Sequence, residues 1–133
     1  MNAVNGNTGK GAPRSFKLMI VDDSNIMRRR IERSQNFEEI ELVGTAANGV
    51  EAIELFKKMD PDVVTMDLTM PQMDGIECIE NIVKIKPAVR ILVISALADK
   101  ATAIEAMEKG ANGFLEKPFT DRQLNEAMAE LIR

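Results

Sequence analysis

Residues 61–71 read Pro61-Asp62-Val63-Val64-Thr65-Met66-Asp67-Leu68-Thr69-Met70-Pro71. The short apolar run at 63–66 is typical of a buried β-strand, and this strand ends at the carboxylate of Asp67. Burial of an acid is unfavourable unless a cation or hydrogen bonds compensate its charge. In open α/β sheets, ligands bind outside this carboxyl end of the strands. We therefore expect Asp67 to belong to a functional site at the edge of a sheet.

The segments on either side of this stretch alternate between strand and helix patterns. Five apolar segments separated by helices favour a single α/β domain whose parallel sheet is covered on both faces. Apolar runs and helical periodicity with capping residues set the boundaries. Strands are predicted over 17–21, 41–46, 63–66, 90–95 and 112–116, and helices over 24–34, 48–59, 74–85, 99–109 and 120–132.

Helical periodicity also predicts which side chains are buried. It puts Ile26 on the core-facing side of the first helix and Val50 on that of the second. Three arginines, 28–30, point in different directions on a helix, so an exposed helix face is the favoured interpretation, with a nucleic-acid patch as the alternative.

Composition excludes several classes of function. The 133 residues include no histidine, tyrosine or tryptophan, so histidine-based catalysis and histidine-ligated zinc are excluded. The single cysteine cannot form a disulfide within the chain. The net charge of −4 makes general nucleic-acid binding unfavourable. No apolar run approaches the roughly 18 residues of a membrane span, and no signal-peptide core is present. We expect a cytoplasmic protein without a membrane segment.

The first fifteen residues differ from the rest. Residues 1–15 are rich in Asn, Gly and Thr, and we predict a disordered N-terminal tail there. Residues 16–133 then form the folded domain. The sequence stops directly after the last predicted helix, so we expect no DNA-binding domain.

The predicted strands end in polar residues. Asp22 and Asp23 follow the first strand, Asp67 follows the third, Ser95 ends the fourth and Lys117 follows the fifth. Right-handed crossovers bring the carboxyl ends of parallel strands to one edge of the sheet. Three carboxylates, a hydroxyl and an ammonium should therefore converge there.

Such a cluster restricts the chemistry. Three neighbouring acids cannot all remain ionised without a cation, and Mg²⁺ favours carboxylate, water and phosphate oxygens. Lys117 can neutralise Asp67 or a phosphate oxygen, and the Ser95 hydroxyl can donate to another phosphate oxygen. The set suits phosphoryl transfer, with an aspartate as the nucleophile.

Four motifs in order make residues 17–133 resemble the receiver domain of response regulators, and in particular the stand-alone regulators of chemotaxis. The resemblance implies a single (βα)5 flavodoxin-like fold, a doubly wound parallel five-stranded sheet with strand order 2-1-3-4-5. The matching motifs are Val21-Asp22-Asp23, Met66-Asp67-Leu68-Thr69-Met70-Pro71 with Asp74-Gly75, Ser95-Ala96 and Lys117-Pro118-Phe119.

The resemblance also assigns roles at the site. Asp67 would accept the phosphoryl group, and Asp23, Asp67 and the carbonyl of Thr69 would ligate Mg²⁺, with Asp22 contributing through water. Ser95 and Lys117 would bind the phosphoryl oxygens.

The resemblance further implies that the Lys117–Pro118 bond is cis, and it also implies the kinds of partner. A histidine kinase or phosphotransfer protein would supply the phosphoryl group to a monomeric regulator. A downstream target would bind the surface around Phe114, which stands where the family often has tyrosine. Beyond self-phosphorylation and slow self-dephosphorylation, no enzymatic activity is expected.

Two other functions remain open from the sequence. An aspartate-nucleophile phosphatase of the haloacid dehalogenase type needs a second acid two residues after the nucleophile, and Thr69 occupies that position. A phosphate-independent pseudo-receiver would act purely as an interaction module. Its usual sign is loss of the site residues, whereas Asp22, Asp67 and Lys117 are all present.

Overall fold

The fold was analysed in a computed structural model, which describes residues 15–97 and 99–133. The tail predicted at 1–15 lies outside the described residues except for its last position. Five strands form one sheet in the order β2-β1-β3-β4-β5, and every neighbouring pair is parallel. The strands are β1 (Phe16–Val21), β2 (Ile40–Ala46), β3 (Val63–Met66), β4 (Arg90–Ser95) and β5 (Gly113–Glu116).

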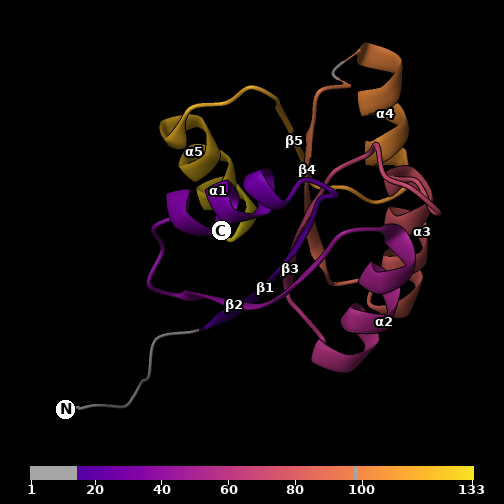
Figure 1. The fold of residues 1–133 in the computed structure, drawn as a ribbon, viewed down its shortest axis with the longest axis horizontal. Coiled ribbons are helices and arrows are strands. Elements are labelled where there is room, and N and C mark those ends of the chain that lie inside the picture. The colour runs from indigo at the N-terminus through magenta and orange to yellow at the C-terminus, as the bar shows by residue number, and fades with distance from the viewer. Residues whose placement is uncertain (1–14, 98) are drawn as a thin grey trace.

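Five helices cover the two faces of this sheet. On one face α1 lies beside α5, and on the other α2, α3 and α4 follow one another (Figure 1). This arrangement confirms the predicted α/β class and the strand order implied by the resemblance. The helices are α1 (Asn25–Ser34), α2 (Gly49–Met59), α3 (Gly75–Ile85), α4 (Lys100–Glu108) and α5 (Asp121–Leu131).

Each helix begins after a side chain that caps it. The first backbone N–H groups of a helix have no partner within the helix, and an Asn, Asp, Ser or Thr oxygen can accept from one of them. Every helix here has such a cap, so each starts one residue later than predicted. The caps are Ser24, Asn48, Asp74, Asp99 and Thr120.

The core is divided by the sheet into two apolar clusters. Successive strand residues point to opposite faces, so Val64 and Met66 pack under α2 and α3 whereas Val63 packs under α1 and α5. Thr65 points to the second cluster with its neighbour Val63. Its hydroxyl is buried and has no hydrogen-bond partner among the described residues.

Two helix residues predicted to be buried are exposed. Ile26 is 80% exposed and Val50 is 43% exposed. Both lie in the first turn of their helix, shortly after the carboxyl end of the preceding strand. None of the helices within 15–97 and 99–133 combines the length and the apolar character needed to cross a bilayer.

Candidate functional site

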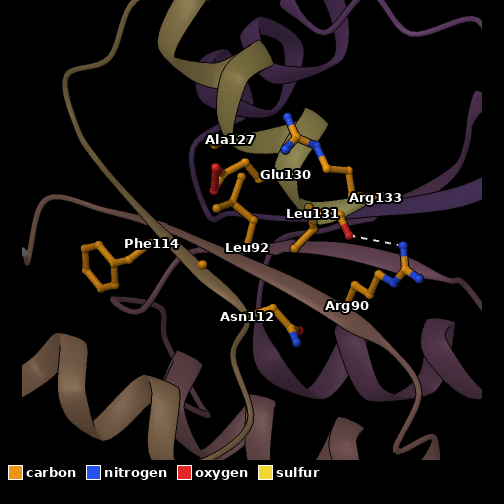
Figure 2. A pocket seen from close by; sticks show the side chains of 9 residues that line it. Arg90, Leu92, Asn112, Phe114, Ala127, Glu130, Leu131 and Arg133 are labelled. Carbon is orange, nitrogen blue, oxygen red and sulfur yellow. Dashed lines mark hydrogen bonds between the residues drawn. The ribbon is translucent and has the colours of Figure 1, made fainter.

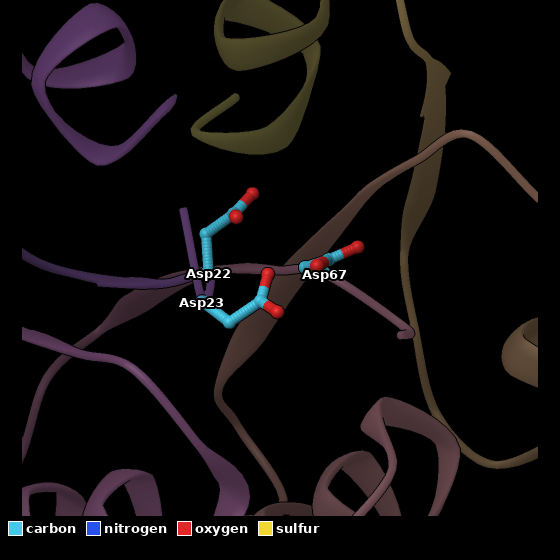
Figure 3. Close-up of side chains that lie close together, drawn as sticks. All are labelled: Asp22, Asp23 and Asp67. Carbon is cyan, nitrogen blue, oxygen red and sulfur yellow. The ribbon is translucent and has the colours of Figure 1, made fainter. Parts of the chain in front are cut away.

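The carboxyl edge of the sheet brings the predicted side chains together. Asp22 and Asp23 follow β1, and Asp67 follows β3 at the adjacent position. One carboxylate oxygen from each of the three lies within 4.8 Å of the others (Figure 3). Ser95, at the end of β4, and Lys117, after β5, complete the same edge. The predicted convergence of the acids is therefore confirmed.

Asp22 is fixed by contacts to both its backbone and its side chain. Its N–H donates to the carbonyl of Ala46 at 3.0 Å, and its carbonyl accepts from the Arg28 guanidinium at 2.6 Å. One carboxylate oxygen accepts from the N–H of Ser24 at 2.9 Å, and the other from Lys117 Nζ at 2.8 Å. The residue is only 1% exposed, so this carboxylate has a single orientation in which it holds Lys117.

Asp67 lies in a less favourable environment. Its N–H donates to the carbonyl of Val21 at 2.9 Å, and Oδ1 accepts from the N–H of Thr69 at 3.4 Å. Burial and the charge of Asp22 raise the pKa of Asp67, and the Lys117 ammonium opposes this effect only in part. Lys117 Nζ lies 3.7 Å from Asp67 Oδ1, farther than from Asp22. Lys117 therefore neutralises Asp22 first, which the sequence did not indicate.

The loop after Asp67 returns very close to its own start. The N–H of Gly75 donates to the carbonyl of Leu68 at 3.0 Å. A Cβ atom at position 75 would overlap the carbonyl oxygen of Asp67 and lie 2.6 Å from Leu68 Cα. Only glycine permits this approach, which explains why the Asp74-Gly75 pair follows the acid.

Ser95 and Lys117 are linked through the backbone. The N–H of Lys117 donates to the carbonyl of Ser95 at 2.9 Å. The Ser95 hydroxyl is fully buried and accepts from the N–H of Leu97 at 3.0 Å, which leaves its own hydrogen able to donate. The Lys117–Pro118 peptide bond is cis, as expected.

The donor set fits a hard divalent cation. Asp22, Asp23 and Asp67 supply only carboxylate oxygens, and Asp23 is exposed, so water can complete a coordination shell from that side. Mg²⁺ binds such sites through one or two carboxylates while it keeps several waters. A cation beside Asp67 would also offset the effects of burial and of the Asp22 charge, which together raise the pKa of this residue.

Phe114 lies apart from the acids, in β5. It is half-buried and packs with the cluster that includes Ala106 of α4. Three large apolar side chains near this helix are exposed, namely Leu97 at 47%, Ile104 at 47% and Met107 at 44%. A shallow cavity of about 310 Å³ lies between β5 and α5, with Phe114 at one end (Figure 2).

Comparisons with known proteins agree with this geometry. The response regulator receiver domain family matches residues 18–129. The chain belongs to this family. It is 43% identical to the chemotaxis protein CheY of Thermotoga maritima over 117 residues, which cover 88% of this chain and 98% of that protein.

Two further matches cover different shares of the other protein. The chain superimposes on a chain of the CheX–CheY–BeF3–Mg²⁺ complex of Borrelia burgdorferi with a TM-score of 0.85 and 32% identity, covering 90% of this chain and 91% of that one. It is also 45% identical to the protein-glutamate methylesterase/protein-glutamine glutaminase 2 of Photobacterium profundum, covering 88% of this chain but 31% of that protein. Family membership thus establishes a receiver domain of the CheY type.

Two residues of α1 that contact the site loops were not singled out from the sequence. Arg28 donates to the carbonyl of Asp22, and Arg30 donates to the carbonyl of Phe119 at 2.6 Å. The three consecutive arginines suggested an exposed helix face, with a nucleic-acid patch as the alternative, whereas Arg28 and Arg30 are half-buried. Their roles depend on which loop each side chain reaches, and no spacing within the helix encodes that.

Proposed function

We propose that the protein is a response regulator that accepts a phosphoryl group on Asp67. The observation that carries the proposal is the cluster of Asp22, Asp23 and Asp67 with the Lys117 ammonium 3.7 Å from the acceptor carboxylate. Family membership supports the same function. Asp23, Asp67 and the carbonyl of Thr69 would hold Mg²⁺, with Asp22 acting through water. The ion would supply positive charge that neutralises phosphate oxygens.

Three side chains of the site have different roles in the transfer of the phosphoryl group. An oxygen of Asp67 attacks the phosphorus and forms an acyl phosphate, while the bond from phosphorus to the donor nitrogen breaks and the donor keeps that electron pair. The Lys117 ammonium balances charge on one phosphoryl oxygen, and the Ser95 hydroxyl donates to another. Charge neutralisation and positioning account for most of the catalysis in such transfers.

The donor would be the phosphohistidine of a histidine kinase or phosphotransfer protein in the cytoplasm. The signal would be read by a target protein on the surface formed by Phe114 and the exposed apolar residues Leu97, Ile104 and Met107. Ile104 and Met107 are three residues apart in α4 and therefore share a helix face, and large apolar side chains exposed together are typical of protein interfaces. Because the chemotaxis proteins are similar over nearly their whole length, a regulator of motility that works as a monomer is the form we propose.

The experiment is binding of beryllofluoride, a phosphoryl mimic, measured by calorimetry with and without Mg²⁺. Wild type should bind it only with Mg²⁺, and Asp67→Ala should abolish binding. Asp62→Ala is the matched control, because it removes an acid from the other end of the same strand and should leave binding intact. Equal binding by wild type and Asp67→Ala would refute the proposal.

Two outcomes would favour the alternatives. If wild type bound no beryllofluoride but still bound its target, the protein would be a phosphate-independent module. Steady turnover of small phosphate esters would indicate a phosphatase. The exposed Thr69 argues against the second, because this position lacks the carboxylate needed to protonate a leaving group.

A further inference from the structure

Helix α1 touches the two loops that carry the charged pair at the site. One loop follows β1 and holds Asp22, and the other follows β5 and holds Lys117. These two side chains form an ion pair of 2.8 Å, of which Asp22 is 1% and Lys117 16% exposed. Figure 1 shows α1 beside α5, so the helix lies next to the end of the second loop as well as directly after the first.

Arg28 holds the first loop. Long helical side chains point back toward the N-terminus of their helix, and Arg28 reaches the carbonyl of Asp22, six residues earlier, at 2.6 Å. Its second nitrogen lies 3.3 Å from the side-chain oxygen of Asn25. A charged donor on this carbonyl fixes the peptide that joins Asp22 to Asp23, and a bond of this kind is stronger than one between neutral groups.

Arg30 holds the second loop through three contacts. It donates to the carbonyl of Phe119 at 2.6 Å, and its guanidinium carbon lies 4.4 Å from the centre of the Phe119 ring. The ring is 4% exposed, so the cation lies over a fixed aromatic face. An ion pair of 3.4 Å with the exposed Asp121 adds little. Phe119 is two residues after Lys117, so this clamp sits at the end of the lysine loop.

Arg29 provides an internal comparison. It lies between the other two arginines, carries the same charge and is exposed. Its side chain makes no hydrogen bond or ion pair with any residue in the part of the chain that the structure describes. A change at Arg29 therefore alters the net charge of α1 without touching either loop.

We propose that Arg28 and Arg30 are positioning residues of the phosphoacceptor site, which place Asp22 and Lys117 relative to Asp67. This inference rests on the function proposed above. Neither arginine touches the reacting atoms. Arg28 acts through the backbone of Asp22, and Arg30 acts through Phe119 on the loop of Lys117. Displacement of a charged group by as little as about 1 Å can slow such a reaction by as much as a hundredfold.

The test compares Arg28→Gln and Arg30→Gln with Arg29→Gln in the full chain. The rate of phosphorylation by acetyl phosphate with Mg²⁺ should fall about tenfold or more in the first two and stay within about twofold of wild type in the third. Arg30→Lys keeps the cation over the ring and one donor, so it should recover part of the lost rate. Thermal unfolding checks that each variant is folded.

A double-mutant cycle separates positioning from a general structural effect. If Arg30 acts through Lys117, then Arg30→Gln should have no further effect on the rate in a Lys117→Ala background. A full additional loss in that background would overturn the proposal. So would equal rates for Arg29→Gln and Arg30→Gln.

A second readout does not depend on phosphorylation. The NMR signals of the Lys117 Cε and Nζ groups, recorded without Mg²⁺, should move toward those of an exposed lysine in Arg30→Gln and remain unchanged in Arg29→Gln. Unmoved signals in Arg30→Gln would overturn the positioning role even if the rate changed. If Asp67→Ala were phosphorylated as fast as wild type, the proposed function would fail, and the lysine signals would still decide the role of Arg30.

Discussion

Strand β3 carries an aspartate at each end, and the two are in opposite electrostatic situations. Asp62 precedes the strand at the amino edge of the sheet, and Asp67 follows it at the carboxyl edge. Burial raises the pKa of both. At Asp62 the N–H of Lys17, at 2.8 Å, and the Lys86 ammonium, at 3.4 Å, outweigh burial, so its pKa lies below the ordinary value. At Asp67 burial prevails, and its pKa is raised.

The difference comes first from the deeper burial of Asp67, whose side chain is 6% exposed against 37% for Asp62, and then from its neighbouring acid, not from a lack of cations. Each aspartate has a lysine within 4 Å, but Lys117 is shared and lies closer to Asp22 than to Asp67. The charge of Asp22 therefore raises the pKa of Asp67 further, in addition to the effect of burial. At the amino edge Asp60 also contacts Lys86, but its side chain is 71% exposed and water screens it. The ionised form of Asp62 stabilises the fold. The ionised form of Asp67 is destabilised by burial and by Asp22, and a bound cation or phosphorylation would remove that destabilisation.

The largest expected effect is that of Gly75→Ala, which tests how tightly the carboxyl edge is built. An added Cβ would collide with the backbone of Asp67 and Leu68, which cannot move without displacing the acid. Alanine is the better helix former at this first helical position, so any loss must come from the collision. We expect a destabilisation of about 3 kcal/mol or more in urea unfolding, together with weaker Mg²⁺ binding.

Gly113→Ala is the matched control for that change. Its added Cβ would lie 3.2 Å from the Leu92 Cδ1 atom, which belongs to a side chain and can shift. The expected cost is below about 1 kcal/mol. Similar losses in the two variants would show that the close approach at Gly75 is not what fixes the loop.

Asp62→Ala should have the second largest effect. It removes the acceptor of the Lys17 N–H and the partner of Lys86, so we expect a loss of about 1 to 2 kcal/mol at neutral pH. Because folding lowers the pKa of Asp62, its contribution is fully present above the unfolded value near 3.8 and disappears as the pH falls through the folded-state pKa. Unfolding followed over pH checks this. A loss that stayed constant down to acid pH would mean that the charge of Asp62 is not responsible.

Thr65 lies between the two aspartates and has a buried hydroxyl with no partner among the described residues. Thr65→Val replaces that hydroxyl with a methyl group of similar size. We expect stability to increase by about 1 kcal/mol, measured by urea unfolding. Thr65→Ser is the control, because it keeps the hydroxyl and loses the methyl group, and it should destabilise. A destabilising Thr65→Val would indicate that the hydroxyl is hydrogen-bonded in solution.

Much of this architecture could be predicted from the sequence because its signals are local. Apolar runs marked all five strands to within one residue, and polar residues at their ends identified the edge where Asp67 lies. Each predicted helix began at the residue that caps the observed helix. Ile26 was placed wrongly because helical periodicity shows which residues share a helix face but not how much of that face the fold covers.

The electrostatic difference between Asp62 and Asp67 could not be predicted in the same way. Both acids flank the same apolar run, and each has lysines elsewhere in the chain. Which lysine reaches which acid depends on distances between loops, such as the 0.9 Å by which Lys117 is nearer to Asp22 than to Asp67. The contacts of Arg28 and Arg30 escaped prediction for the same reason.

Asp67→Asn should have the smallest effect on stability, and it should stabilise the protein whereas Asp62→Ala destabilises it. Without Mg²⁺ it removes a buried charge that Asp22 repels, so the melting temperature should rise. The rise should be only a few degrees, because the substitution also removes the attraction to Lys117.

Folding raises the pKa of Asp67, so its ionisation destabilises the fold above the folded-state pKa. The difference from wild type should therefore be largest near neutral pH and vanish as the pH falls through that pKa toward the unfolded value near 3.8. Mg²⁺ should reduce or reverse the difference, because it stabilises only the form with an intact site. A variant less stable than wild type without Mg²⁺ would show that Lys117 already compensates Asp67 in full, and the contrast between the two ends of β3 would not hold.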